Sequence, residues 1–150
     1  MIDVALARQL HAAGLRWRPE PGDRFIIESP TFEGEPEVFT ISEMTIEAHH
    51  YPTGTELGFN GTTEWALDSV SADDSLWLPR EDQLRILLAR SFKALTRRGE
   101  GHFHVVVTID GDERGFEDRD AENAYGRALL AYIESALRLD GVETEAEAGA

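Results

Sequence analysis

Two histidines in a β-rich stretch are the residues whose type and spacing best suit catalysis. His102 and His104 lie two positions apart in HFHVVVTI, so a strand there would place both on one face. Asp110 and Asp112 follow on the turn beyond it, and two imidazoles with a carboxylate can hold a metal ion for hydrolysis. Such pairs are more often two histidines on a solvated strand face. A metal-dependent hydrolase using His102 and His104 is therefore the least favoured functional hypothesis.

Other motifs of catalysis do not occur in the sequence. The chain has no cysteine, which excludes a thiol nucleophile, a cysteine zinc site and a disulfide framework. Neither a Gly-x-Ser-x-Gly elbow nor a phosphate-binding Gly-x-x-x-x-Gly-Lys-[Ser/Thr] loop is present, and Lys93 is the only lysine. Some pair of carboxylates will always look suitable among 29 Asp and Glu. We therefore name no catalytic residue, expect no cofactor and do not favour an enzyme.

Three regions could form a binding surface. Arg90, Lys93 and Arg97 would lie on a basic outer face of a helix predicted at residues 80–98, where they could contact phosphate or an acidic partner. The favoured interpretation of these charges is complementation of the helix dipole and pairing with the acidic remainder. The turn at residues 60–65 and the Trp77-Leu78 pair offer aromatic groups, which more often pack in a core. The speculative binding residues are Asn60, Thr62, Trp65, Trp77, Arg90, Lys93 and Arg97.

Charge limits the classes of partner. The net charge is −15, with 41% apolar residues over 150 positions, which fits a globular chain with a real core. Residues 99–150 carry net −9 and residues 1–98 net −6. An acidic surface argues against direct binding of nucleic acid or an anionic membrane. The sequence has no apolar run of membrane-spanning length and no signal-peptide pattern at its start, so we expect no membrane partner and a cytoplasmic location.

The best-defined predicted element is the helix at residues 80–98. Pro79 suits its first turn, Glu81 and Asp82 suit the positive end of the dipole, and Gly99 suits the C-terminal cap. Its apolar positions recur at helical spacing: Leu84, Leu87, Leu88, Ser91, Phe92 and Leu95. We expect this helix to be the structural spine between two groups of strands.

The remaining elements favour the α+β class. Helices are expected at 3–13 and 121–139, the latter capped by Asp118 or Asp120. The buried stripe of the second helix is expected to comprise Ala121, Ala124, Tyr125, Ala128, Leu129, Tyr132, Ile133 and Ala136. Strands are expected at 23–28, 38–43, 44–49, 55–59, 102–109 and 114–117. The segment near 62–70 is expected to be a short helical turn, with a strand as the alternative. Asp110-Gly111 predicts a hairpin turn. The prediction is a single α+β domain at 1–139 with antiparallel strands and hairpins, about three helices packed on them, possible subunits 1–98 and 99–139, and an acidic disordered tail at 140–150.

Several blocks also resemble a family of small actinobacterial proteins without established function. The blocks are LARQLHAAGLRWRPEPGDRF, FTISEMTIEAHHYPTGTELGFNGTTEWALDSV and LWLPREDQLRILL, within roughly residues 5–135. Some such sequences are automatically labelled pilus assembly protein, a label that belongs to a nucleotide-binding ATPase family whose phosphate-binding loop does not occur here. The spacing from Gly14 to Asp23 and from Trp77 to Leu84 is similar to short proteins of phages and their hosts. The resemblance implies a small accessory protein and no reaction.

A non-enzymatic protein-binding or regulatory module is thus the leading hypothesis. Its partner is an unknown protein, and a homodimer is one assembly that it could form through an apolar helix or an edge strand. The alternative is an acidic decoy that mimics nucleic acid and occupies a DNA- or RNA-binding protein, since the net charge is −15.

Overall fold

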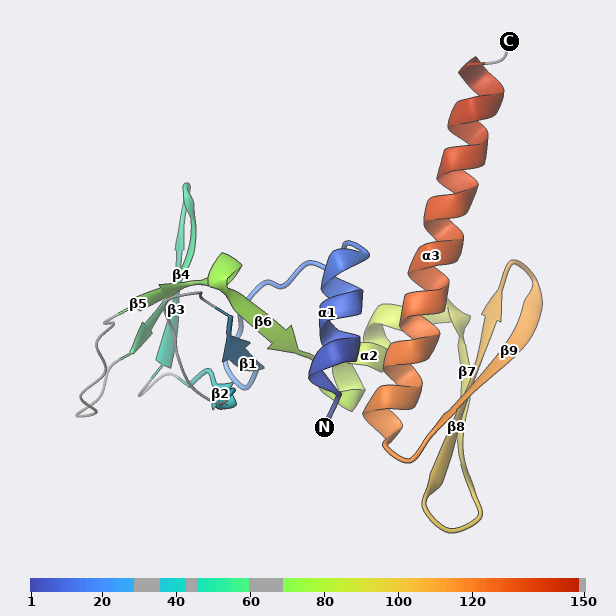
Figure 1. The fold of residues 1–150 in the computed structure, drawn as a ribbon, viewed down its shortest axis with the longest axis horizontal. Coiled ribbons are helices and arrows are strands. Elements are labelled where there is room, and N and C mark those ends of the chain that lie inside the picture. The colour runs from blue at the N-terminus through green and yellow to red at the C-terminus, as the bar shows by residue number, and fades with distance from the viewer. Residues whose placement is uncertain (29–35, 43–45, 60–68, 149–150) are drawn as a thin grey trace. The chain divides into compact units, whose positions relative to one another are not determined.

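The computed structural model describes residues 1–28, 36–42, 46–59 and 69–148 (Figure 1). Within these residues the chain has three α-helices and three antiparallel three-stranded sheets, which confirms the predicted α+β class. It divides into two compact units: unit 1 comprises residues 1–15 and 80–150, and unit 2 comprises residues 16–79. These limits differ from the possible subunits 1–98 and 99–139, because the first helix belongs with the C-terminal half of the chain.

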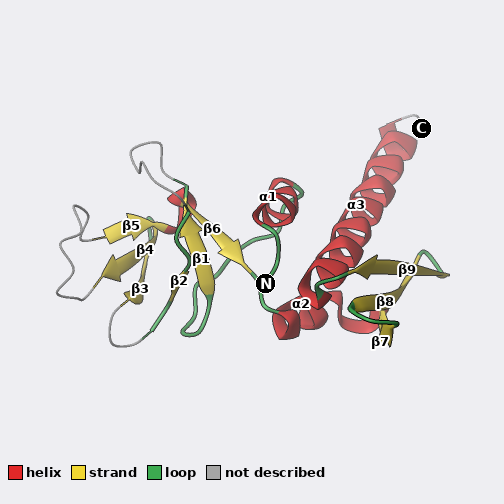
Figure 2. Ribbon diagram, turned by 60° about the horizontal axis from the view of Figure 1, so that its bottom comes forward, coloured by secondary structure: helices red, strands yellow, loops and turns green. Residues whose placement is uncertain are grey.

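Unit 1 is a three-stranded sheet with a long helix on one face. The strands are β7 (Phe92–Arg98), β8 (His102–Ile109) and β9 (Asp112–Asp118), in the order β7-β8-β9. Helix α3 (Ala121–Ala148) packs on β8 and β9, and both α1 (Val4–Ala12) and α2 (Glu81–Leu88) pack against α3. Figure 2 shows the three strands of this sheet along one side of α3. The helix is therefore the element on which unit 1 is assembled.

The packing of α3 on β8 follows from the spacing of buried residues, which is helical in α3 and alternates in β8. Alternate β8 residues Val105, Val107 and Ile109 are buried, as expected for one face of a strand. On α3 the buried positions include Ala124, Tyr125, Ala128 and Leu129, as predicted, and the two alanines let the helix approach closely. Tyr132 was expected in the same stripe but is 40% exposed. Ser135 is buried instead, and its hydroxyl donates a hydrogen bond to Asp110 at the hairpin turn.

The predicted helix at residues 80–98 is wrong beyond Leu88. Helix α2 ends there, Ala89 has φ +50, a 3₁₀ turn (η2) follows at Ala89–Ser91, and residues 92–98 form β7. Leu84 and Leu88 are buried as expected, but Leu95 pairs with Val105 of β8. Gly99 therefore lies in a hairpin turn with φ +59 and is not a helix cap. Long-range pairing with β8 overrides a local pattern that fits a helix equally well.

Helix α3 is longer than predicted. It continues through Ala148, whereas a disordered tail was expected from residue 140. Alanine and glutamate dominate the sequence TEAEA in this stretch, and both are strong helix formers. One internal glycine, Gly141, does not end the helix. The low apolar content of the segment therefore did not indicate its backbone conformation.

Unit 2 contains two small sheets. One consists of β1 (Arg24–Ile27), β2 (Phe39–Thr40) and β6 (Ser75–Leu78), and the other of β3 (Ile46–Tyr51), β4 (Gly54–Phe59) and β5 (Ser69–Ser71), with a 3₁₀ turn η1 at Ala72–Asp74. The strands expected at 44–49 and 55–59 correspond to β3 and β4, which pair as a hairpin. Phe25, Phe39, Ile41 and Leu57 lie in one buried cluster. Trp77 and Leu78 belong to β6, which ends two residues before the first residue of the helix predicted at 80–98.

Candidate functional site

An open groove runs over α3 in unit 1, with α1 and β9 as its walls. Its volume is about 550 Å³. The apolar part of the lining comes from all three elements: Leu6 of α1, Phe116 of β9, and Leu130 and Ala131 of α3. Charged and amide side chains surround these groups, namely Asp3, Gln9, Arg114, Asp118, Asn123, Arg127 and Glu134. Apolar groups together with charged and amide groups are the usual composition of a protein-binding surface.

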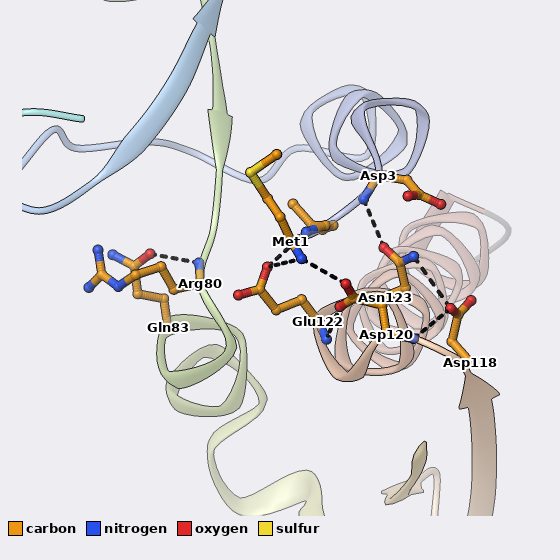
Figure 3. A network of polar contacts seen from close by, with 9 residues as sticks. Met1, Asp3, Arg80, Gln83, Asp118, Asp120, Glu122 and Asn123 are labelled. Carbon is orange, nitrogen blue, oxygen red and sulfur yellow. Dashed lines mark hydrogen bonds and ion pairs between the residues drawn. The ribbon is translucent and has the colours of Figure 1, made fainter. Parts of the chain in front are cut away.

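Asn123 fixes one end of the groove (Figure 3). Its side-chain oxygen accepts a hydrogen bond from the Asp3 backbone N–H at 2.8 Å, and its Nδ2 donates to Asp118 Oδ1 at 3.4 Å. The side chain is buried, with 6% of the residue exposed. Arg127 Nε lies 3.6 Å from the other carboxylate oxygen of Asp118. One amide thus joins the beginnings of α1 and α3 to the end of β9.

The chain's first residue joins the same network. The Met1 ammonium group donates a hydrogen bond to Asp120 Oδ2 at 2.7 Å and lies 3.6 Å from Glu122 Oε2. The hydrogen bond to Asp120 is the main reason that the pKa of this ammonium group is raised above its ordinary value of 8.0, although burial opposes the shift. Ile2 N–H donates to Glu122 Oε2 at 2.7 Å. These contacts hold α1 against the N-terminal turn of α3.

Asp120 caps α3, as the sequence predicted. Its Oδ1 accepts a hydrogen bond from Glu122 N–H at 2.8 Å, which satisfies an N–H group that has no partner within the helix. Burial alone would raise the pKa of Asp120, but the Met1 ammonium and the Glu122 N–H outweigh burial and lower it below 3.8. Asp118, the other predicted cap, accepts from the Asp120 N–H at 3.1 Å. Both aspartates therefore organise this end of the groove.

Three charged side chains of the groove remain available for a ligand: Asp3, Arg114 and Glu134. The Arg114 guanidinium carbon lies 5.3 Å from the centre of the Phe116 ring, a cation–π arrangement. Within the described part of the chain, none of these three charged side chains forms an ion pair. Asp118, Arg127 and Asn123 are already engaged with each other, so they position the walls of the groove, whereas the three available side chains can receive a partner.

A second open groove lies between α2, β7 and α3. Its lining includes Glu81, Arg85, Phe92 and Tyr125, and its volume is about 680 Å³. The rings of Phe92 and Tyr125 are 5.6 Å apart. Burial, and then the nearby charge of Glu81, raises the pKa of the Tyr125 hydroxyl. Here an aromatic floor meets charges of both signs, without the three-element hydrogen-bond network of the first groove.

The sequence-predicted binding residues do not form one surface. Asn60, Thr62 and Trp65 lie outside the described residues. Trp77 is half-buried in unit 2, and its Nε1 has no hydrogen-bond partner among the residues the structure describes. The predicted basic helix face is wrong, because β7 replaces the second half of that helix. Exposed Arg90 lies in η2, whereas Lys93 and Arg97 are exposed on β7.

His102 and His104 share a face of β8, as their spacing predicted. His102 is exposed and His104 is half-buried. Glu117, the cross-strand partner of His104, lies 3.3 Å from Arg98 Nη1 in an ion pair. In residues 1–28, 36–42, 46–59 and 69–148, no three His, Asp or Glu side chains are grouped in a way that could hold a metal ion. The two imidazoles lie on the sheet face opposite to α3, and Asp110 is bonded to Ser135.

Comparison with known proteins gives no further guide: family models, curated proteins and solved structures yield no match. Among the described helices, none combines the length and apolar character needed to cross a membrane.

Sequence reasoning missed Arg114, Phe116, Asn123 and Arg127 as groove residues. The strand predicted at 114–117 was a usable signal for Arg114 and Phe116, because alternate side chains of a strand point to the same face. Asn123 and Arg127 carried no comparable signal, since their role depends on contacts with α1 and β9.

Proposed function

We propose that this protein is a non-enzymatic protein-binding or regulatory module, and that the groove between α1, β9 and α3 is its binding surface. The observation that carries this proposal is the combination of an open groove, lined by both apolar and charged side chains, with walls held in place by the Asn123 network. A surface that is organised before binding loses less entropy when a partner docks. Arg114 and Glu134 then supply charges of both signs for specificity.

A matched pair of leucine variants tests the groove. Leu130 lines it, whereas Leu137 lies on the same helix, is 55% exposed and is outside the lining. We expect affinity capture from the native host, after chemical cross-linking, to recover a partner with the wild type and with Leu137→Arg. Leu130→Arg should lose it while keeping a cooperative thermal transition. If all three proteins recover the partner, the binding surface lies outside the groove. If the wild type recovers no partner, the proposed function is contradicted.

Light scattering after size exclusion distinguishes a homodimer from a complex with a different protein. A homodimer through the groove would become monomeric in Leu130→Arg and remain dimeric in Leu137→Arg. A monomer in all three proteins, together with a captured partner, would mean that the groove binds a different chain. The measurement needs no knowledge of the partner.

The second candidate is the acidic decoy, and the charge of unit 2 favours it. Residues 16–79 contain three Arg and 13 Asp and Glu, net −10, whereas unit 1 carries net −5. Asp73 and Asp74 are exposed on η1, and Glu56 is exposed on β4. If these carboxylates mimic phosphates, a captured partner should be displaced by double-stranded DNA and lost in the Asp73→Asn, Asp74→Asn double variant. Retention under both conditions would remove this candidate.

A further inference from the structure

The outer strand of the unit 1 sheet has an open backbone edge. Asp110 and Gly111 have φ +54 and +83, which defines a two-residue hairpin turn. Ile109 and Asp112 therefore close the turn as a hydrogen-bonded pair. Alternation along β9 then directs the N–H and C=O groups of Glu113, Gly115 and Glu117 away from β8. The Glu117 carbonyl confirms this direction, because it accepts a hydrogen bond from Arg127 Nη1 at 3.3 Å.

Most of these outward groups are unpaired. Among the described residues, the N–H and C=O groups of Glu113 and Gly115 and the N–H of Glu117 form no hydrogen bond. The groove lies beside this edge, because β9 contributes Arg114, Phe116 and Asp118 to its lining. The opposite edge, β7, has a bulge between Phe92 and Ala94 near its beginning, and bulges disfavour strand addition. The edge of β9 is regular from Asp112 to Asp118.

We propose that an extended, basic segment of a partner protein adds to β9 as the fourth strand of this sheet and lies in the groove. The inference rests on the proposed protein-binding function and names the class of partner. Strand addition supplies affinity through main-chain hydrogen bonds, and the alternate side chains of the added segment supply specificity. The outward groups of Glu113 and Gly115 pair with the segment, and its side chains on the α3 side reach the groove floor.

The charges of β9 specify the segment. Glu113 and Glu117 project from the sheet face opposite to α3, on either side of Gly115. Glu117 is already paired with Arg98, so a Lys or Arg of the segment complements Glu113 first, and one four positions away shares Glu117 with Arg98. On the other face, a carboxylate opposite Arg114 and an apolar side chain opposite Phe116 match the groove. The net charge of −15 also attracts basic segments over long range.

A second copy of β9 does not meet these requirements. A symmetric pairing of β9 with its own copy, centred on Gly115, places Glu113 directly opposite Glu117 of the other strand. Like charges in that arrangement are destabilising. The glutamates thus disfavour this self-pairing while they attract a basic strand.

Gly115 allows His104 to reach the same edge. A Cβ at position 115 would overlap His104 Nε2, so the imidazole lies across β9 where a side chain would otherwise stand. A side chain of the added strand opposite Gly115 would meet this ring. In the proposed complex, His104 therefore contacts the partner directly, without a metal ion.

A synthetic peptide tests strand addition on the full-length protein. The probe is a fluorescent peptide of about ten residues, near the length of a long strand, that alternates Lys with Val and Thr. We expect fluorescence anisotropy to show at least about tenfold tighter binding than for the same peptide with Glu in place of Lys. Binding should also slow amide exchange at Glu113 and Gly115 by about tenfold or more. No binding of the Lys peptide, or slowed exchange elsewhere only, would overturn the proposal.

Two variants of Glu113 separate charge from backbone pairing. Glu113→Gln removes only the charge and should weaken binding about threefold, whereas Glu113→Pro also removes the outward N–H and should weaken it by about a further tenfold. Proline is tolerated on an edge strand where its nitrogen faces solvent. A Lys peptide N-methylated at alternate residues tests the same bond without changing the protein, and it should lose binding. Equal affinities of both variants, or of both Lys peptides, would contradict strand addition.

Host capture distinguishes this inference from the proposed function. If the partner is lost in Leu130→Arg and in Glu113→Pro but kept in Glu113→Gln, the proposed function and the strand-addition inference are both supported. If Glu113→Pro still captures it, the groove binds a partner without strand addition and the inference fails alone. If the wild type captures no partner, the proposed function fails, whatever the peptide does.

Discussion

Asn123 is the residue on which the walls of the groove depend most. Replacing it with Leu keeps a similar volume but leaves the Asp3 N–H without its partner and removes one hydrogen bond to Asp118 Oδ1, which still accepts from the Asp120 N–H. We expect Asn123→Leu to lower the free energy of unfolding by about 1–3 kcal/mol, the usual effect of unsatisfied buried groups. Urea denaturation measures it, with Gln9→Leu, which changes an exposed amide of the groove rim, as control. Equal stability of both variants would show that the network does not hold the groove.

The Met1–Asp120 pair predicts a dependence of stability on pH. The pKa of the ammonium group is raised above 8.0 in the folded protein and that of Asp120 is lowered below 3.8. The pair therefore stabilises the fold between these values; the effect is lost as pH rises through the raised pKa or falls through the lowered one. Acetylation of Met1 should lower the melting temperature at pH 7 and have little effect well above the raised pKa.

Asp120→Asn is the matched control for acetylation, since asparagine also caps helices well. In that variant acetylation should no longer change the melting temperature at pH 7. An undiminished effect would assign the stabilisation to Glu122, whose Oε2 lies 3.6 Å from the ammonium group.

At the scale of elements, the sequence predicted those whose signal is local. The strand at 102–109 matches β8 at both ends, and the Asp110-Gly111 turn and Asp120 as the cap of α3 are also confirmed. The stretch after Leu88 was misread because Phe92 and Leu95 continue the helical spacing from Leu84. Nothing in the local sequence marks the positive φ of Ala89. Only the pairing with β8 decides between helix and strand there.

Contact between α1 and α3 depends on Gly126. A Cβ at this position would lie 2.8 Å from Leu6 Cδ2 and 3.1 Å from Ile2 Cδ1. Alanine gains about 1 kcal/mol of helix propensity over glycine, but overpacking costs about 1–3 kcal/mol. We therefore expect Gly126→Ala to destabilise the protein by about 1 kcal/mol in urea denaturation. In a Leu6→Ala background the same change should be stabilising, and destabilisation in both backgrounds would place the strain elsewhere.

At the scale of the molecule, the two units could not be predicted from the sequence. Unit 1 joins residues 1–15 to residues 80–150, and its decisive hydrogen bonds link residues 120 positions apart, such as Asp3 to Asn123. No periodicity or composition signals a contact across that distance. The unequal charge appears only once the units are known: net −10 in unit 2 and net −5 in unit 1. Counting along the chain instead placed the excess of acid after residue 98.

The total charge and the local charge of β9 should affect different rate constants. The Debye length falls from about 30 Å at 0.01 M salt to about 8 Å at 0.15 M, so salt screens long-range attraction more than a docked contact. We expect the association rate constant of the Lys peptide to fall about tenfold over this range, with a smaller change in dissociation. Stopped-flow fluorescence measures both rates.

Variants with altered charge then separate steering from contact. Asp73→Asn with Asp74→Asn removes two exposed charges of unit 2 and should slow association slightly without changing dissociation. Glu113→Gln removes one charge at the proposed contact and should speed dissociation about threefold. If the unit 2 variant instead changes dissociation and Glu113→Gln does not, the basic segment binds to the carboxylates of unit 2, and the acidic decoy becomes the better account of the protein.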